Sequence, residues 1–388
     1  MLTDNFESHA NRFLDSKLAA KDRHALAQEI RESIEIVQTS EYSNFLQHFV
    51  KAFNTYLRGT SNDQSPYFVP PVERFNTESP SYKTRSVLLE ILNRVPTTDV
   101  LKPFAPELLK LCMHLLENDD EDNAVIALRI ILDLHKQYRR APNVPGILEP
   151  EVQPFLDFVC KVYTNFKRTL EEAFAPLATP ANPAQPKVRR STESFKVVTE
   201  CPLIVMFLFQ LYENYAAGNV VTLLPLMVRA INLRAPQIAK SPSTSATFVD
   251  FIAAQVKTLS FLTYLLRGTP EYVRPHKESI PLSVVQLLVS CPHDSIAVRK
   301  ELLVATRHIL ATDFREGFFK HVDIFLDENL LVGTSRGAGD SLRPLAYSEF
   351  VCKCISIHNE YMYPSVHIYT FVHACISMHV RTRIQAFI

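Results

Sequence analysis

A chain of 388 residues with 41 basic and 41 acidic side chains carries no formal net charge, and 47% of its residues are hydrophobic. This balance argues against a dedicated nucleic-acid binder, which needs a basic surface to displace counterions from the phosphates. Only 8 residues are glycine, where average usage would give about 27. Sheets and nucleotide-binding loops need glycine for positive φ and close backbone approach, so the composition predicts an all-α protein.

The N-terminal region predicts three helices, because apolar residues recur there at helical spacing. The three cover residues 4–18, 22–37 and, from Ser40 or Ser43, up to Gly59. Asp22 is a candidate cap of the second helix. A polar stretch with prolines, 60–80, then leads to a fourth helix over 81–94.

Two stretches, 106–138 and 281–310, share one pattern of apolar helix, acidic turn and second apolar helix. When Asp120 is laid over Asp294, an offset of 174 residues, apolar positions coincide. The coinciding pairs are Leu108 with Leu282, Leu111 with Val285, Leu115 with Val289, Ala124 with Val298, Leu128 with Leu302 and Ile131 with Ala305. The offset is about four units of ~40–47 residues, which predicts a HEAT/armadillo-like α-solenoid of stacked antiparallel helix pairs.

Between these pairs, a helix over 151–174 precedes a Pro-rich stretch, 176–194, with few large apolar side chains. Such a stretch cannot offset its ordering entropy and predicts a linker or loop. The segment 201–212 is nearly all apolar but shorter than the ~20 residues of a membrane span, so we expect a helix buried on several sides. Further helices are expected over 220–233, 248–267 and 314–326.

The last residues, 349–388, change character, with few charges and no apolar stripe at helical spacing. Within them, 361–380 lacks charges over the length of a membrane span, but histidines, a proline and hydroxyls make it a poor one. We therefore expect no membrane association. Four parts follow: N-terminal helical repeats (1–175), a Pro-rich linker or loop (176–194), a second block of HEAT-like repeats (195–348) and a divergent, poorly ordered tail (349–388).

No pattern in the chain predicts catalytic, cofactor or metal chemistry. The loop GTSRGAGD at 333–340 matches neither G-x-x-x-x-G-K nor G-x-G-x-x-G and follows no predicted strand. Cys352 and Cys354 are too close for the usual zinc spacing. Four histidines lie in amphipathic helices without a nucleophile signature beside them: His24, His114, His135 and His308. We therefore expect no enzyme, and no catalytic, cofactor-binding or metal-binding residue.

One basic cluster, formed by Lys187, Arg189 and Arg190, lies inside the Pro-rich stretch. It could be recognised by nuclear import machinery, or be modulated by phosphorylation at Ser191 or Thr192. Because three charges are few, a solvated linker is the favoured interpretation. The seven cysteines are scattered behind a charged N-terminus without an apolar segment, which predicts free thiols in a reducing compartment.

The most specific motifs lie in 296–348. They read RKELL at 299–303, HIL at 308–310, LDE at 326–328, LVG at 331–333 and LRPLAYS at 342–348. These motifs resemble the N-terminal HEAT region of the transformation/transcription domain-associated protein family (TRRAP). The stretches 119–134 and 199–210 look similar to the same family, so the resemblance covers residues 1 to 348 and leaves a divergent tail after Ser348.

The resemblance implies a non-catalytic scaffold. Members of this family are large helical proteins related to the phosphatidylinositol-3-kinase-like kinases, with a kinase-like domain that lacks catalytic residues. They are implied to recruit histone acetyltransferase complexes by contacting activators. We accordingly expect a nuclear protein whose partners are transcriptional activators and co-activator complex subunits, without direct nucleic-acid binding.

The interpretation as a scaffold leaves two further expectations. The alternative function is a HEAT-type transport or phosphatase-scaffold protein, which would share the same architecture. The last helix pair would leave an apolar face uncapped, so the sequence also predicts self-association through the C-terminal repeat.

Overall fold

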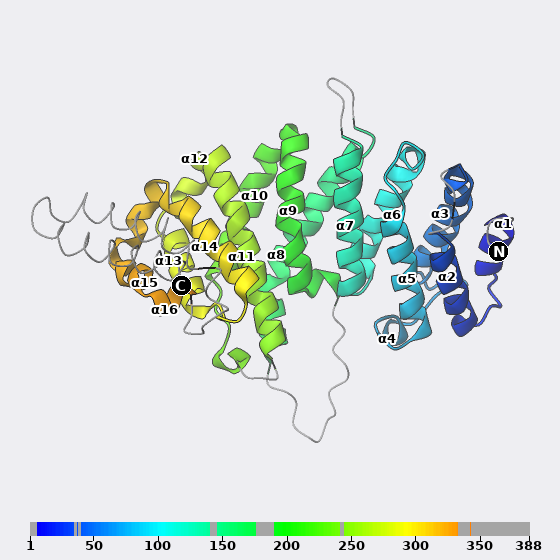
Figure 1. Cartoon of the computed structure of the whole chain (residues 1–388), viewed down its shortest axis with the longest axis horizontal. Helices are drawn as coiled ribbons and strands as arrows, with labels where there is room; N and C mark the ends of the chain where they lie inside the picture. Colours follow the sequence, from blue (N-terminus) through cyan, green and yellow to red (C-terminus); the bar gives the residue numbers. More distant parts are fainter. Residues whose placement is uncertain are drawn as a thin grey trace, which may run out of the picture. The chain divides into compact units, whose positions relative to one another are not determined.

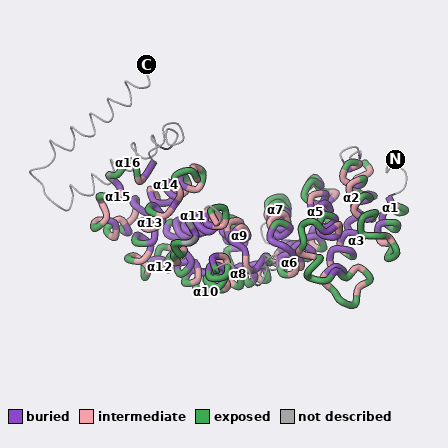
Figure 2. Tube along the Cα trace, turned by 90° about the horizontal axis from the view of Figure 1, so that it is seen from below, coloured by how far each residue is buried: buried purple, intermediate pink, exposed green. Residues whose placement is uncertain are grey.

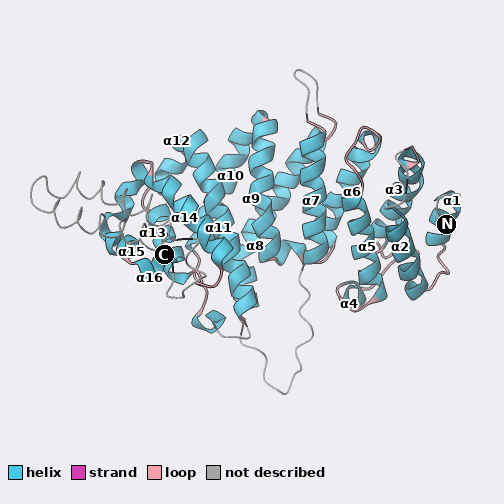
Figure 3. Ribbon diagram, viewed as in Figure 1, coloured by secondary structure: helices cyan, strands magenta, loops and turns pink. Residues whose placement is uncertain are grey.

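The structure is a computed structural model, and it describes residues 6–34, 37, 40–139, 146–175, 190–240, 244–332 and 342. These residues form helices joined by turns, and the described part of the chain contains no β-strand (Figure 3). Its only strand-like pairing is an isolated bridge between Asp120 and Arg190. The all-α class predicted from the scarcity of glycine is therefore confirmed.

The chain divides into two compact units, residues 1–254 and 255–388, with the boundary inside helix α11 (Ser245–Gly268). In unit 1 the helices alternate between two layers, with the buried residues between them (Figures 1 and 2). One layer contains α1 (Phe6–Phe13), α3 (Tyr42–Gly59), α6 (Ala105–Asn118), α8 (Val152–Ala173) and α10 (Glu213–Asn232). The other contains α2 (Ala20–Ile34), α5 (Pro80–Arg94), α7 (Glu121–Gln137) and α9 (Phe195–Leu211). This alternation is the architecture of stacked helix pairs that the sequence predicts.

Short helices complete unit 1 at the connections. They are α4 (Pro71–Arg74) and the 3-10 turns η2 (Lys102–Phe104), η3 (Glu149–Glu151), η4 (Ser191–Glu193) and η5 (Gln237–Lys240). The polar stretch between α3 and α5 thus contains a helical turn, α4, that the sequence analysis does not anticipate. Pro71 opens it, because a fixed φ and a missing N–H suit the first helical position.

Caps and prolines set the helix ends in unit 1. Ser79 accepts a hydrogen bond from the Tyr82 N–H at 3.0 Å, and Pro80 opens α5. Asp120 accepts from the Asp122 N–H at 2.9 Å and so begins α7. Each cap satisfies a donor that the first helical turn leaves unpaired, a contribution of about 1 kcal/mol.

Helix α1 ends earlier than its apolar spacing predicts. It stops at Phe13 rather than residue 18, whereas α2 begins at Ala20 and is described up to Ile34, since residues 35 and 36 lie outside the described residues. The cause is tertiary: Arg23 donates to the Phe13 carbonyl at 3.0 Å and to the Asp15 carbonyl at 2.5 Å. A side chain from the next helix therefore terminates α1.

Unit 2 contains a further helix pair, α13 (Ser279–Ser290) and α14 (Ile296–Leu310). Its other helices are α12 (Pro270–Val273), η6 (Arg274–His276), η7 (Asp313–His321), α15 (Val322–Leu326) and α16 (Glu328–Val332). The α-helix predicted over 314–326 is wrong for its first part, which is the 3-10 helix η7. Gly317 lies there against Pro281, and an added Cβ would come within 2.6 Å of the Pro281 Cγ. This close approach, which only glycine allows, sets the path of the segment.

Both stretches form a helix pair, and the predicted pairing of positions holds for part of the pattern. Three predicted pairs are buried in both stretches: Leu111 with Val285, Leu128 with Leu302 and Ile131 with Ala305. Leu108 and Leu115 are buried, whereas their predicted counterparts, Leu282 and Val289, are 44% and 56% exposed. Because α13 is apolar on more than one face, apolarity alone does not identify its buried side.

One helix among the described residues, α11, is long and apolar enough to cross a membrane by length and composition alone. However, 67% of its most apolar window is buried inside the protein, as in the core helix of a folded domain. The segment 201–212 belongs to α9 up to Leu211, and Tyr212 follows the end of the helix. The predicted tail, 349–388, and most of the Pro-rich stretch, 176–189, lie outside the described residues. The predicted division at 175, 194 and 348 therefore stays a prediction.

Candidate functional site

The basic cluster predicted from the sequence is described only at Arg190, since Lys187 and Arg189 lie outside the described residues. Arg190 is exposed and forms the bridge with Asp120. The next residue, Ser191, is completely buried, and its hydroxyl donates to the Leu116 carbonyl. Phosphorylation of Ser191 would therefore require this contact to open first.

The segment 190–196 is fixed on three helices. The Ser191 N–H donates to the Asp119 carbonyl at 3.4 Å, and the Asn165 side chain of α8 donates to the Thr192 carbonyl at 3.2 Å. The Ser194 hydroxyl donates to Glu121 at 2.6 Å while its oxygen caps α9. This end of the predicted linker is therefore packed.

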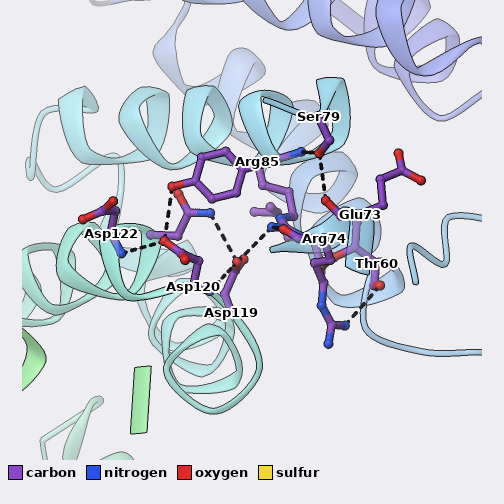
Figure 4. A network of polar contacts seen from close by, with 11 residues as sticks. Thr60, Glu73, Arg74, Ser79, Arg85, Asp119, Asp120 and Asp122 are labelled. Carbon is purple, nitrogen blue, oxygen red and sulfur yellow. Dashed lines mark hydrogen bonds and ion pairs between the residues drawn. The ribbon is translucent and has the colours of Figure 1, made fainter. Parts of the chain in front are cut away.

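The segment meets a buried ion pair, which Figure 4 shows from close by. The Arg85 Nη2 lies 3.1 Å from the Asp119 Oδ1, and the two side chains are 0% and 3% exposed. Arg85 comes from α5, whereas Asp119 lies in the α6–α7 turn. The pair therefore joins successive helix pairs inside unit 1. Asp119 also accepts from the Asp120 N–H at 2.7 Å and the Asn123 amide at 3.2 Å, which helps to offset its desolvation.

Asp120 forms the second buried carboxyl group of this turn. The Tyr82 hydroxyl donates to it at 3.2 Å, in addition to the Asp122 N–H. Burial raises the pKa of Asp120 to about 6, and the charge on Asp122 adds to this effect. Burial, followed by the neighbouring Asp120, also raises the pKa of Tyr82. The turn is therefore a strongly desolvated carboxyl site.

The same network reaches the loop between α3 and α5. Arg85 donates to the Arg74 carbonyl, and the Arg74 guanidinium donates to the Thr60 carbonyl at 3.3 Å (Figure 4). The Ser79 hydroxyl donates to the Glu73 carbonyl at 2.9 Å. The ion pair and the loop are therefore parts of one hydrogen-bonded structure.

Buried arginine recurs at other helix junctions. In unit 2, Arg299 of α14 is completely buried and donates to four carbonyls, with no carboxylate bound to it in the described part of the chain. The four acceptors are Leu288, Cys291, Leu330 and Leu331. Burial lowers the pKa of Arg299. Arg23 plays the corresponding part at the end of α1.

The buried arginine sites hold neighbouring helices in place, because their polar groups bond to a carboxylate or to backbone carbonyls. The described residues contain no group of three histidine, cysteine or acidic side chains arranged to hold a metal ion. Of the four histidines singled out from the sequence, His135 is buried beside the Tyr212 hydroxyl at 3.4 Å, and burial lowers its pKa to about 4. His114 lies 2.8 Å from the Ser61 hydroxyl, and His24 and His308 also lie on helices.

The buried arginines are not recognisable as a site from local sequence patterns. The available signal is a charged residue in the apolar register of a helix: Arg85 lies between Tyr82 and Leu88, and Arg299 precedes Leu302 by three. Periodicity counts such a residue as an interruption and does not indicate its partner.

A family model and several known proteins are similar in sequence to this chain. The family model described as the Tra1 HEAT repeat central region matches residues 247–369. The chain is 35% identical, over 92% of its length, to the probable transcription-associated protein 1 of Dictyostelium discoideum. It is 33% identical over 83% to the human transformation/transcription domain-associated protein. It is 31% identical over 87% to the SAGA complex/NuA4 acetyltransferase complex subunit Tra1 of Schizosaccharomyces pombe.

The chain spans only 9%, 9% and 10% of the length of these three relatives. Their names agree with the resemblance of the 296–348 motifs to the TRRAP family. The matching description is the central HEAT region rather than the N-terminal one, and the match continues past Ser348 to residue 369. The start of the tail expected from the sequence therefore does not coincide with the end of the family match.

Proposed function

Because the chain belongs to the Tra1/TRRAP family, we propose that it is a non-catalytic interaction scaffold that takes part in acetyltransferase co-activator complexes. The observation that carries the proposal is similarity over 92% of the chain to a transcription-associated protein, at 35% identity. Relatives named as SAGA/NuA4 acetyltransferase complex subunits in two yeasts suggest the class of partner. On this proposal its partners are subunits of such complexes and transcriptional activators, and it acts in the nucleus.

The helical architecture supports a scaffold role. Stacked helix pairs bury their inner faces against one another and leave their outer side chains for partner proteins. In unit 1 the buried ion pair of Arg85 and Asp119 joins helix pairs inside the array. The transport or phosphatase-scaffold alternative is not favoured, because the reported relatives carry transcription-associated names.

Affinity purification of the tagged full chain from nuclear extract, with mass spectrometry, tests the proposal. We expect acetyltransferase-complex subunits to be enriched over a tag-only control. Enrichment of small GTPases or phosphatase subunits instead would support the alternative and contradict the proposal.

The nuclear location is tested separately with a fluorescent fusion. We expect a nuclear signal that moves to the cytoplasm in the triple variant K187A/R189A/R190A. The bridge between Arg190 and Asp120 uses backbone groups, so this variant keeps it. A nuclear signal unchanged in the variant would remove the import role of the cluster, and a cytoplasmic wild-type protein would contradict the nuclear location itself.

A further inference from the structure

The loop between α3 and α5 exposes an apolar tip, defined as residues 68–72. Val72 is 86% exposed, the highest value among the large exposed apolar side chains of the described residues, and Phe68 is 39% exposed. Pro70 and Pro71 are exposed beside them. Scattered apolar residues on a surface are ordinary, but four in one short loop form a patch.

The loop is fixed from both sides despite this exposure. The Val69 N–H donates to the Thr60 carbonyl at 3.1 Å and closes the base of the tip. The Tyr67 hydroxyl donates to the Leu14 carbonyl at 2.6 Å, which ties the loop to the end of α1. An added Cβ at Gly59 would come within 2.5 Å of the Ser65 Oγ, so the chain packs closely here as well.

The other side of the tip is held by the buried ion-pair network. Arg85 donates to the Arg74 carbonyl and pairs with Asp119, so the C-terminal end of α4 is joined to the interior of unit 1. Figure 1 shows α4 at the edge of unit 1, beyond the end of α5. A tip fixed in this way loses little conformational entropy when a partner binds, which favours affinity.

Within residues 61–79, the exposed charged side chains are all acidic. Asp63, Glu73 and Glu78 are exposed, and of these Glu78 pairs with Lys83 at 2.8 Å. Arg74 is the only basic residue in 61–79, and its guanidinium faces inward, toward the Thr60 carbonyl and over the Phe75 ring. Figure 4 shows the Glu73 side chain pointing away from the network. The outer face of the loop is therefore apolar with an acidic border.

We propose that the 68–72 tip inserts into an apolar cleft of a partner protein, and that lysine or arginine residues border this cleft. Phe68 and Val72 fill the cleft, while Asp63 and Glu73 meet the basic border. Tip-to-tip pairing of two copies does not fit, because it would bring like charges together. The tip is also too small to form the ~1,200 Å² of a specific interface alone, so it anchors a larger one. The choice of a co-activator subunit as this partner rests on the proposed function.

Site-specific photo-crosslinking tests the contact. A benzoylphenylalanine replaces Val72 in the full chain, which is irradiated in nuclear extract, and the crosslinked peptides are sequenced. We expect peptides of one protein in which apolar residues adjoin lysine or arginine. The matched control carries the crosslinker at Val221 of α10, which is 59% exposed, and we expect different peptides from it. No crosslink at position 72, a dimer of the chain, a lipid adduct, or the same peptides from both positions would each overturn the proposal.

A charge-reversal variant tests the acidic border. The double substitution D63K/E73K, made in the crosslinker chain, should lower the crosslink yield about tenfold. Both side chains are exposed, so the midpoint of thermal unfolding should stay unchanged. An unchanged yield in the folded variant would contradict the basic border.

The tip and the proposed function can fail separately. If Val72→Asp leaves the co-purification of acetyltransferase subunits unchanged and position 72 does not crosslink, the tip proposal fails and the function stands. If the chain recovers no such subunit while position 72 crosslinks a basic and apolar peptide of another protein, the tip proposal stands and the function fails.

Discussion

Among the described residues, each unit buries one arginine completely, yet the two units compensate its charge differently. In unit 1, Arg85 faces the carboxylate of Asp119, which belongs to the next helix pair. In unit 2, Arg299 finds carbonyl groups at the ends of α13 and α16. A buried ion pair couples two groups that each become costly when the other is removed, whereas carbonyl dipoles divide the compensation among several weaker acceptors. The charge of the buried arginine is therefore compensated mainly by one carboxylate in unit 1 and by several carbonyl groups in unit 2.

The largest expected effect comes from breaking the ion pair on its acidic side. Asp119→Ala leaves the Arg85 guanidinium buried without a counter-charge, so the free energy of unfolding should fall by about 3–5 kcal/mol. Chemical denaturation followed by circular dichroism measures this loss. The double variant R85M/D119L is the control: it removes both charges and should recover most of the stability. A loss below about 1 kcal/mol in Asp119→Ala would contradict the importance of the pair.

A second test compares the two arginines directly. Arg85→Met leaves a buried carboxylate and should cost about as much as Asp119→Ala, whereas Arg299→Met leaves only carbonyls and should cost about 1–3 kcal/mol. Both variants are measured by denaturation in the same buffer. Equal losses would show that charge compensation does not distinguish the units.

The pH dependence isolates Asp120, the second buried carboxyl group of the turn that holds the unit 1 ion pair. Because burial holds the pKa of Asp120 at about 6, above its ordinary 3.8, the folded state binds more protons than the unfolded state between these values. The free energy of unfolding therefore falls, through this group, as pH rises from about 4 to about 6. Asp120→Asn should remove the effect and gain about 1–2 kcal/mol relative to wild type across this range.

Denaturation midpoints of wild type and Asp120→Asn at several pH values measure that gain. His135 gives the opposite slope, because burial lowers its pKa to about 4 and its stabilisation is lost as pH falls from 6.5 toward that value. It is present in both proteins, so the difference between them reports Asp120. A difference that stays constant with pH would contradict the raised pKa.

The smallest expected effect concerns two helix starts. Ser194 caps α9 and donates to Glu121, whereas Ser295 before α14 makes no side-chain cap. Ser194→Ala should therefore cost about 1 kcal/mol, and Ser295→Ala a few tenths. Thermal unfolding compares the two. Equal shifts would indicate that the segment 190–196 is held mainly by its other contacts.

Much of the fold is predictable because the sequence signals of a helix lie within a few neighbouring residues. The scarcity of glycine, the prolines at helix starts and the 3.6-residue spacing identify the helix pairs of both units, and motifs in 296–348 identify the family. Which face of an apolar helix is buried is not predictable in this way. Leu282 and Val289 are as apolar as the buried side chains of α13, and only the neighbouring helices decide that Val284 and Leu287 face inward.

The sequence by itself determined that this chain is an array of helix pairs of the Tra1/TRRAP family, because periodicity, composition and short motifs act over a few residues. Tertiary structure alone decided which charges are buried and which apolar residues are exposed. Arg85 and Asp119 are separated by 34 residues (119 − 85), and the pairing exists only because α5 packs beside α7. Val72 remains outside because the contacts of Thr60, Arg74 and Ser79 hold its loop away from the core. Burial is a property of neighbours in space, and a local pattern does not contain them.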